Sequence, residues 1–171
     1  MAYEISKSFA YSTKDIRTPL GIAPVCTPDN QLVISTILRA GLPFHQGFLS
    51  YFDNAENAFV SAYRKYKDTL KFDIHIEYIA SPRIDGKTLI ITDPMLATGG
   101  SGVEAVNFIK QHGGKNIKFM SIIAAPEGLK RLHEAHPDIQ IYVGHLDRCL
   151  NENAYICPGL GDAGDRIFGT K

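Results

Sequence analysis

The sequence carries no net formal charge, because its 18 Lys and Arg residues balance its 18 Asp and Glu residues. A neutral chain exerts no general attraction on nucleic acid or on anionic lipid. It also has no apolar run near the roughly 18 residues that span a membrane. We therefore expect no nucleic-acid partner and no membrane partner, and any anion must be bound by a local site.

Cysteine is scarce. Cys26, Cys149 and Cys157 are too few and too scattered for a disulfide framework, and none forms the CxxC pair typical of zinc or redox sites. The first residues, Met1 to Lys7, include no apolar stretch of the kind that directs secretion. These absences predict a reducing, cytoplasmic setting.

Internal repeats, low-complexity tracts and Pro- or Ser-rich linkers are also absent. With 44% hydrophobic and 21% charged residues, the chain has the composition of an ordinary globular protein. A length within about 100–200 residues favours one domain. We therefore expect residues 1–171 to form a single domain.

Short, fully apolar runs recur along the chain and predict buried strands of a parallel sheet covered on both faces. Between and after them, stretches at about 103–110 and 127–135 have apolar residues at helical spacing. This alternation predicts an α/β fold, with a parallel-sheet core and flanking helices. The predicted strands are Leu32–Leu38, Thr88–Thr92, Ile117–Ala125 and Ile139–Val143.

Two segments depart from this alternation. Phe72–Tyr78 alternates apolar and polar residues, which predicts an exposed antiparallel arm within the stretch Phe59–Ile79. The tail, Asn151–Lys171, concentrates glycine and turn-forming residues in Pro158–Asp165. The tail is therefore either a surface loop or a lid over a binding site.

The most informative segment is Ile90–Gly102, with the sequence IITDPMLATGGSG. A strand delivers Asp93 at its carboxyl end, and a glycine-rich turn then leads into a helix. Backbone N–H groups and the helix dipole at such a helix start bind anions without net positive charge. Thr98 and Ser101 add hydroxyl donors. The segment thus supplies the local anion site that the neutral composition requires.

Two common nucleotide motifs do not fit this segment. A Walker A loop needs a Lys after its last glycine, whereas Ser101 follows Gly99 and Gly100. A Rossmann fingerprint can be forced onto Gly100–Ala105, but residues 93–99 separate it from the strand. No acid follows about 20 residues later to bind a ribose hydroxyl. Both motifs are therefore set aside.

The segment Asp93–Ser101, DPMLATGGS, resembles the phosphoribosyl pyrophosphate loop of the type I phosphoribosyltransferases, in the form found in the uracil phosphoribosyltransferase family. The resemblance extends from about Tyr3 to the C-terminus. It implies the type I phosphoribosyltransferase fold, with a core of about residues 30–145, a β-arm and a C-terminal base-binding hood of about residues 146–171. Other blocks that match this family, in order, are Ile37–Leu42, Tyr63–Arg64, Ala124–Gly128, Tyr155–Asp165 and Phe168–Thr170.

The resemblance implies an enzyme of pyrimidine salvage that converts uracil and phosphoribosyl pyrophosphate to UMP and diphosphate. Its implied catalytic residues are Asp93, Arg39 and Arg64. Asp93 would hold the ribose hydroxyls and face the positive charge that develops at the anomeric carbon. The two arginines and Mg²⁺ would neutralise the leaving diphosphate. The metal is expected to be bound mainly through the substrate, with no direct protein ligand.

The family's substrate contacts carry over residue by residue. Uracil would be read by Ile156, Gly161, Asp162 and Ala163, whose backbone groups can match its carbonyl and N–H groups. Further implied partners are copies of the same chain, in a homodimer or higher homo-oligomer, and GTP as an effector. The contacts implied for phosphoribosyl pyrophosphate are Arg39, Arg64, Asp93, Pro94, Met95, Leu96, Ala97, Thr98, Gly99, Gly100, Ser101 and Asp162.

Simpler interpretations remain open for individual residues. Arg39 taken alone is typical of a salt bridge at a strand end, and Arg64 belongs to a charged run that usually marks a solvated face. Asp165 is interpreted as ordering its own loop through bonds to backbone N–H groups. Cys157 is interpreted as a packing residue beside the base pocket.

The sequence departs from the family in two places. Family members carry about thirty-five or more residues before the point that matches Tyr3, a length well short of a domain, so we expect this chain to lack their N-terminal segment. Pro43 and Gln46 stand where the family more often has Gly and an acid. We expect altered diphosphate contacts there.

Two other functions remain open. One is a non-catalytic, uracil phosphoribosyltransferase-like domain that senses nucleotides, and the other is an RNA-binding pyrimidine attenuation regulator that shares the phosphate loop. The neutral charge and the tail Gly159–Asp165 argue against the regulator. The presence of Asp93, Arg39 and the whole loop argues against the sensor.

Overall fold

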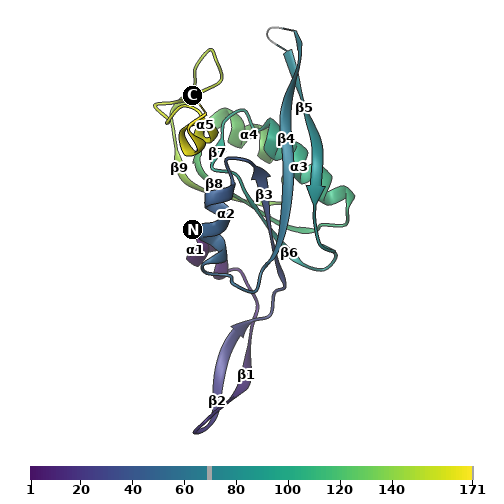
Figure 1. Ribbon diagram of the computed structural model, residues 1–171, viewed down its shortest axis with the longest axis vertical. Coiled ribbons are helices and arrows are strands. Elements are labelled where there is room, and N and C mark those ends of the chain that lie inside the picture. The colour runs from purple at the N-terminus through teal and green to yellow at the C-terminus, as the bar shows by residue number, and fades with distance from the viewer. Residues whose placement is uncertain (69–70, 171) are drawn as a thin grey trace.

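A seven-stranded sheet forms the centre of the protein (Figure 1). The structure is a computed structural model that describes residues 1–68 and 71–170, with the backbone alone along residues 62–68 and 71–79. The strand order is β5-β4-β3-β6-β8-β7, and β9 also pairs with β8. The pairs are parallel except that β5 is antiparallel to β4. The strands are β3 (Leu32–Leu38), β4 (Glu56–Asp68), β5 (Lys71–Ala80), β6 (Thr88–Thr92), β7 (Met95–Leu96), β8 (Asn116–Ala124) and β9 (Gln140–Leu146).

The central strands are buried because their sequences are apolar toward both faces of the sheet. Every residue of β6 is buried, as are the first six of β3. Leu89 and Ile91 pack into a cluster on one face, and Ile90 packs into a second cluster on the opposite face. The predicted parallel core is confirmed, and the observed bounds of β3 and β6 are the predicted ones.

Two long helices cover the first face. They are α3 (Gly100–Gln111) and α4 (Pro126–Ala135), and their buried side chains include Val106 and Leu132 in the same cluster as Leu89. Both helices follow the apolar spacing of the sequence and lie where it predicts them. The helix N-termini consequently lie at the carboxyl end of the parallel strands.

Two short helices cover the opposite face, and the sequence analysis predicted neither. They are α1 (Ala2–Ser6) and α2 (Leu42–Leu49), which contribute Ile5 and Phe48 to the second cluster. A helix of this length is marginal on its own and depends on packing. For α2, burial of Phe48 against the sheet supplies that packing. Pro43 and Gln46, where altered diphosphate contacts were expected, are exposed residues of this helix.

An antiparallel hairpin of β1 (Tyr11–Thr18) and β2 (Gly21–Pro28) projects away from the sheet at the end opposite the C-terminus (Figure 1). The sequence analysis predicted no structure there. A second antiparallel pair, β4 and β5, extends from the edge of the main sheet and confirms the predicted antiparallel pairing. The predicted exposure of Phe72–Tyr78 concerns side chains outside the described part of the chain.

The tail folds over the carboxyl end of the sheet, beside α4 (Figure 1). It contains a short hairpin of β10 (Cys149–Leu150) and β11 (Ile156–Cys157), followed by α5 (Ala163–Phe168). The division into a core and a hood at about residue 146 stays a prediction. None of the helices in the described part of the chain is both long and apolar enough to cross a membrane.

Candidate active site

The glycine-rich loop joins the end of β6 to the start of α3. Gly99 has φ +77°, in the left-handed region that glycine adopts without strain, and α3 begins at Gly100. No described side chain caps this helix start. The N–H groups of the first turn therefore face outward with the positive end of the helix dipole, as an anion site requires.

Contact with α4 holds this loop in place. Gly128, in the first turn of α4, lies so close to the loop that an added Cβ would press against the carbonyl oxygens of Ala97 and Leu96. The Arg131 guanidinium donates to the Thr98 carbonyl at 3.5 Å. The shape of the loop thus depends on a helix that α3 and β8 separate from it in the chain.

Asp93 lies at the carboxyl end of β6, where a parallel sheet commonly places its functional groups. The Met95 N–H donates to its carboxylate at 3.3 Å. Burial raises the pKa of Asp93 to about 7, and the Met95 N–H opposes that rise. The carboxyl group is therefore ready to ionise when positive charge arrives beside it.

Arg39 lies at the carboxyl end of the neighbouring strand, β3. The buried hydroxyls of Thr36 in β3 and Thr92 in β6 are 2.5 Å apart, and their contact joins the carboxyl ends of these two strands. The peptide bond between Leu38 and Arg39 is cis. Because β3 and β6 are parallel neighbours, Arg39 and Asp93 lie at the same edge of the sheet.

The tail binds Arg39 through three groups. The Arg39 guanidinium donates to the Thr170 hydroxyl at 3.2 Å and lies 3.6 Å from the Asp165 carboxylate. It also lies 5.6 Å from the centre of the Phe168 ring. Asp165 was interpreted as ordering its own loop through bonds from backbone N–H groups to its carboxylate. The carboxylate instead accepts from the Thr170 hydroxyl at 2.6 Å, and it is the Asp162 carboxylate that accepts a backbone N–H, that of Asp165, at 2.9 Å. The structure adds the ion pair between Asp165 and Arg39. Arg39 therefore forms a strand-end salt bridge as well as facing the site.

The hood is fixed to the sheet by Asp147. This buried residue donates its N–H to the Ala124 carbonyl at 2.8 Å, and its carboxylate accepts from the Gly159 N–H at 3.2 Å. The same carboxylate lies 3.4 Å from His145. The sequence analysis missed Asp147 because a single Asp after a strand carries no motif.

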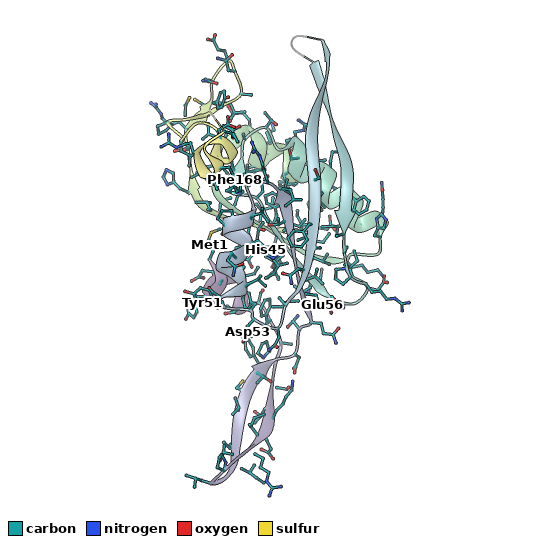
Figure 2. All side chains as sticks on the ribbon, in the orientation of Figure 1. Met1, His45, Tyr51, Asp53, Glu56 and Phe168 are labelled. Carbon is teal, nitrogen blue, oxygen red and sulfur yellow. The ribbon has the colours of Figure 1, made fainter. Side chains whose placement is uncertain are left out.

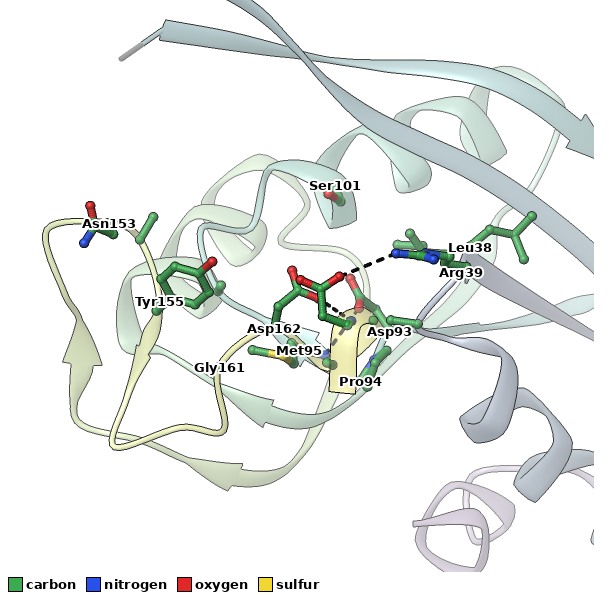
Figure 3. A pocket seen from close by; sticks show the side chains of 17 residues that line it. Leu38, Arg39, Asp93, Pro94, Met95, Ser101, Asn153, Tyr155, Gly161 and Asp162 are labelled. Carbon is green, nitrogen blue, oxygen red and sulfur yellow. Dashed lines mark hydrogen bonds and ion pairs between the residues drawn. The ribbon is translucent and has the colours of Figure 1, made fainter. Parts of the chain in front are cut away.

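A pocket of about 340 Å³ opens between the hood, Arg39 and the start of the loop (Figure 3). Figure 3 shows the Arg39 side chain pointing toward the carboxylates that gather in it. The charged side chains of its described lining are Arg39, Asp93, Asp162 and Asp165. With three carboxylates against one guanidinium, the pocket suits an anionic ligand that arrives with a cation.

The structure brings most of the predicted site residues together. Leu96, Thr98, Gly99 and Gly100 line a small adjoining hollow of about 50 Å³ that also borders Asp93. The predicted residues that line the main pocket are Arg39, Asp93, Pro94, Met95, Ala97, Ser101, Gly161, Asp162 and Ala163. These residues come from three separate segments, which the fold joins at one edge of the sheet.

Two predicted residues stand apart. Ile156 is buried, with 2% of its surface exposed, and lies beside the pocket without being among its lining residues. Arg64 has its backbone in β4, and its side chain lies outside the described part of the chain. Cys157, interpreted as a packing residue, is half-buried next to Ile156.

The pocket has further walls that sequence reasoning missed. Asn153 and Ala154 line it from the turn between β10 and β11, and Gly164 lines it from α5. The signal available was the polar turn sequence around Asn151, whose carboxamide accepts from the N–H groups of Asn153 and Tyr155 at 3.0 and 2.9 Å. That signal predicts a turn but does not indicate what the turn faces.

Two solved structures place this architecture in a class. A protein of Aquifex aeolicus superposes with a TM-score of 0.91 at 40% identity, covering 99% of this chain and 81% of that one. A hypoxanthine-guanine phosphoribosyltransferase of Bacillus anthracis superposes with a TM-score of 0.54 at 16% identity, covering 87% and 73%. The second likeness shows the fold alone. The fold is that of the type I phosphoribosyltransferases.

Sequence relatives narrow this class to one family. A uracil phosphoribosyltransferase of Porphyromonas gingivalis is 54% identical over 173 residues, covering 100% of this chain and 80% of the relative. One of Finegoldia magna is 47% identical over 174 residues, covering 100% and 81%. The family model described as uracil phosphoribosyltransferase matches residues 1–170. The chain belongs to the uracil phosphoribosyltransferase family, as its motifs predict.

Proposed function

We propose that this protein transfers the phosphoribosyl group of phosphoribosyl pyrophosphate to uracil. N1 of uracil forms a bond to C1 of the ribose, the bond from C1 to the diphosphate oxygen breaks, and the N1 proton is released. The products are UMP and diphosphate, which makes the protein a pentosyltransferase of pyrimidine salvage. One observation carries the proposal: an uncapped helix start, Asp93, Arg39 and the hood residue Asp162 converge on a single pocket.

The 5′-phosphate of the substrate binds the loop at the start of α3. The N–H groups from Ala97 to Ser101 and the hydroxyls of Thr98 and Ser101 are its donors. An exposed helix start compensates a phosphate charge by several oriented dipoles without any Lys. The contact of Gly128 with Ala97 supports this assignment, because it fixes the loop before the ligand arrives.

Asp93 acts on the ribose. Its carboxylate accepts from the ribose hydroxyls and faces C1, where positive charge grows as the bond to diphosphate breaks. A carboxylate fixed in a desolvated position stabilises that charge more than water does. Burial raises the pKa of Asp93 to about 7, which agrees with a desolvated position for this carboxyl group. We assign Asp93, Arg39 and Arg64 as the catalytic residues.

The diphosphate binds beside Arg39, where a single described guanidinium faces three carboxylates. Mg²⁺ that enters with the diphosphate would supply the missing positive charge there. Within the residues that the structure describes, no group of three or more His, Cys, Asp or Glu side chains is placed to hold a metal ion. Asp93 and Asp162 line the pocket and would lie near a cation that enters on the substrate.

Uracil binds under the hood. Gly161 and Ala163 line the pocket, and the buried Ile156 packs near Gly159 in the same segment. Gly161 has φ +81° and open space around its Cα, which leaves its backbone accessible to a flat base. Cytosine would leave a backbone group unpaired at this position, which favours uracil.

The hood and the core act as one domain in this proposal. Besides the two bonds of Asp147, the Leu150 N–H donates to the Glu127 carboxylate of α4 at 3.0 Å, and this bond lowers the pKa of Glu127. Such ties to β8 and α4 favour a hood that moves little relative to the phosphate loop.

The chain is proposed to act as a homodimer or higher homo-oligomer. Leu20 and Ile22, near the tip of the β1–β2 hairpin, are 99% and 72% exposed. A projecting hairpin with exposed apolar side chains favours burial against a second copy. A cytoplasmic location and GTP as an effector are proposed from the family resemblance alone.

The decisive experiment measures diphosphate release from uracil and phosphoribosyl pyrophosphate, with and without Mg²⁺. We expect release only when both substrates and Mg²⁺ are present, and UMP in equal amount. A nucleotide sensor would bind UMP without turnover, and an RNA-binding regulator would bind RNA instead. If the intact oligomer turned over neither uracil nor a 5-substituted uracil, the enzyme assignment would be wrong.

A further inference from the structure

A buried histidine lies outside the pocket, between α2 and β4 (Figure 2). His45 is 4% exposed, and its Nε2 lies 2.7 Å from the Asn57 side-chain oxygen. Its ring also stacks on Phe59, with centroids 5.3 Å apart and planes at 30°. Two independent contacts thus hold one ring against the same strand.

The surroundings of His45 define its protonation. Its Nδ1 is buried and has no hydrogen-bond partner among the described residues. A buried N–H without an acceptor is costlier than a buried lone pair, so Nδ1 is unprotonated. The proton is then on Nε2, which donates to Asn57. Burial lowers the pKa of His45, which agrees with a neutral ring.

The backbone of His45 is bonded to the turn that carries Arg39. Its N–H donates to the Gly41 carbonyl at 2.8 Å, and the same carbonyl accepts from the Thr36 hydroxyl at 3.3 Å. The Leu42 N–H donates to the Arg39 carbonyl at 3.2 Å. The turn is therefore continuous with the first turn of α2.

Two strands hold this turn from different sides. Thr36 anchors it directly to β3, while His45 anchors it through α2 to β4. In the parallel pairing of these strands, Asn57 and Phe59 lie beside Ile34 and Thr36. Without the His45 contacts, α2 would keep its apolar packing through Phe48 but lose the polar and ring contacts that define its position across β4.

We propose that His45 is a positioning residue: its bond to Asn57 and its stack on Phe59 hold the start of α2, and with it Arg39, in the place that binds diphosphate. His45 is not among the residues that line the pocket, and it acts through the turn alone. This inference rests on the proposed function and adds a residue to its diphosphate subsite.

Two variants at this position test the inference. His45→Leu removes the N–H and the ring, and we expect the KM for phosphoribosyl pyrophosphate to rise about tenfold while kcat stays within about threefold. His45→Gln places an amide N–H where Nε2 lies but lacks the ring that stacks on Phe59, so its KM should rise clearly less than that of His45→Leu. Steady-state kinetics with saturating uracil and Mg²⁺ give both constants.

A matched control separates positioning from stability. Phe48→Leu alters the same helix at a residue that is 2% exposed and packs in the second cluster. It should lower Tm and leave the KM unchanged. The inference fails if His45→Leu lowers Tm with a wild-type KM, or if His45→Gln loses affinity as much as His45→Leu.

Calorimetric binding of phosphoribosyl pyrophosphate distinguishes this inference from the proposed function. A wild-type protein that binds it without releasing diphosphate would overturn the transfer reaction, while the dissociation constants of the two variants would still test His45. A wild-type protein that does not bind it at all would overturn both.

Discussion

At the residue scale, Asp93 combines two demands that oppose each other. In the proposed reaction, charge stabilisation at C1 requires an ionised carboxylate, whereas burial favours the protonated form. The result is a pKa of about 7 in the free protein. Mg²⁺ that enters with the substrate, and the positive charge that develops at C1, would each lower that pKa, so ionisation is coupled to the arrival of the substrate.

Replacing Asp93 with Asn tests its role in the reaction. We expect kcat to fall about a hundredfold or more with little loss of phosphoribosyl pyrophosphate binding, because the charge acts mainly in the transition state. Kinetics and calorimetry on the same sample measure the two effects. Equal losses of rate and of binding would indicate a structural role instead.

The raised pKa of Asp93 predicts that the stability of the protein depends on pH, and the same variant tests this. The pKa of Asp93 rises from 3.8 to about 7 on folding, so the unfolded chain binds fewer protons between these values and the free energy of unfolding falls as pH rises. Asn carries no such cost. The Tm of Asp93→Asn should therefore exceed that of the wild type at pH 8, with a difference that shrinks toward pH 4. At pH 8 the Asp93 carboxyl is roughly one pH unit above its pKa in the folded protein, and at pH 4 it is close to its pKa in the unfolded chain.

Asp53→Asn, at an exposed position, serves as the control. Its Tm difference from the wild type should be small at both pH values. A constant Tm difference for Asp93→Asn across the range would contradict the raised pKa.

At the element scale, the strand, loop and helix from β6 to α3 form the unit that sequence patterns predict best. Its information is local: an apolar run, an acid, glycines and an amphipathic helix follow one another in the chain. The contact that fixes the loop is not local, because Gly128 belongs to the next helix. The family-matching segment Ala124–Gly128 indicates family membership, but it does not show that Gly128 contacts Ala97.

Gly128→Ala tests that contact. The added methyl group would press on the carbonyl oxygens of Ala97 and Leu96, so the loop must shift. We expect phosphoribosyl pyrophosphate to bind about tenfold or more weakly, because small displacements of a preorganised site are costly. Gly47→Ala in α2, where an added Cβ meets nothing within 4 Å, is the matched control. Unchanged affinity in Gly128→Ala would show that the loop tolerates the shift.

At the scale of the whole molecule, the hairpin of β1 and β2 exposes apolar side chains that no described element of the chain covers. Leu20→Asp combined with Ile22→Asp should shift the protein from an oligomer toward a monomer, because charges there oppose burial. Sedimentation velocity at several concentrations measures the shift. Lys14→Ala on the same hairpin is a control that should leave the assembly intact, and an unchanged oligomer in the double variant would exclude this hairpin from the interface.

The site itself also exists only at the scale of the molecule. Arg39 contacts Thr170, which is 131 positions away in the chain, and Asp147 joins β8 to the Gly159 turn. The sequence analysis assigned Arg39 and Asp162 to one site by resemblance. It offered no account of the ion pair with Asp165, because that contact depends on how the tail folds back.

By itself, the sequence determined the parallel core, the glycine-rich turn from strand to helix, and the family. Each of these features depends on residues that follow one another in the chain. Apolar runs such as Leu32–Leu38 and Thr88–Thr92 predict buried strands, and the segment DPMLATGGS predicts the turn between strand and helix. The tertiary structure alone decided the helix at Leu42–Leu49, the projecting hairpin and the contacts of His45, Asp147 and Arg39. A short helix or a single polar side chain gains its stability from partners distant in the chain, and local patterns do not record those partners.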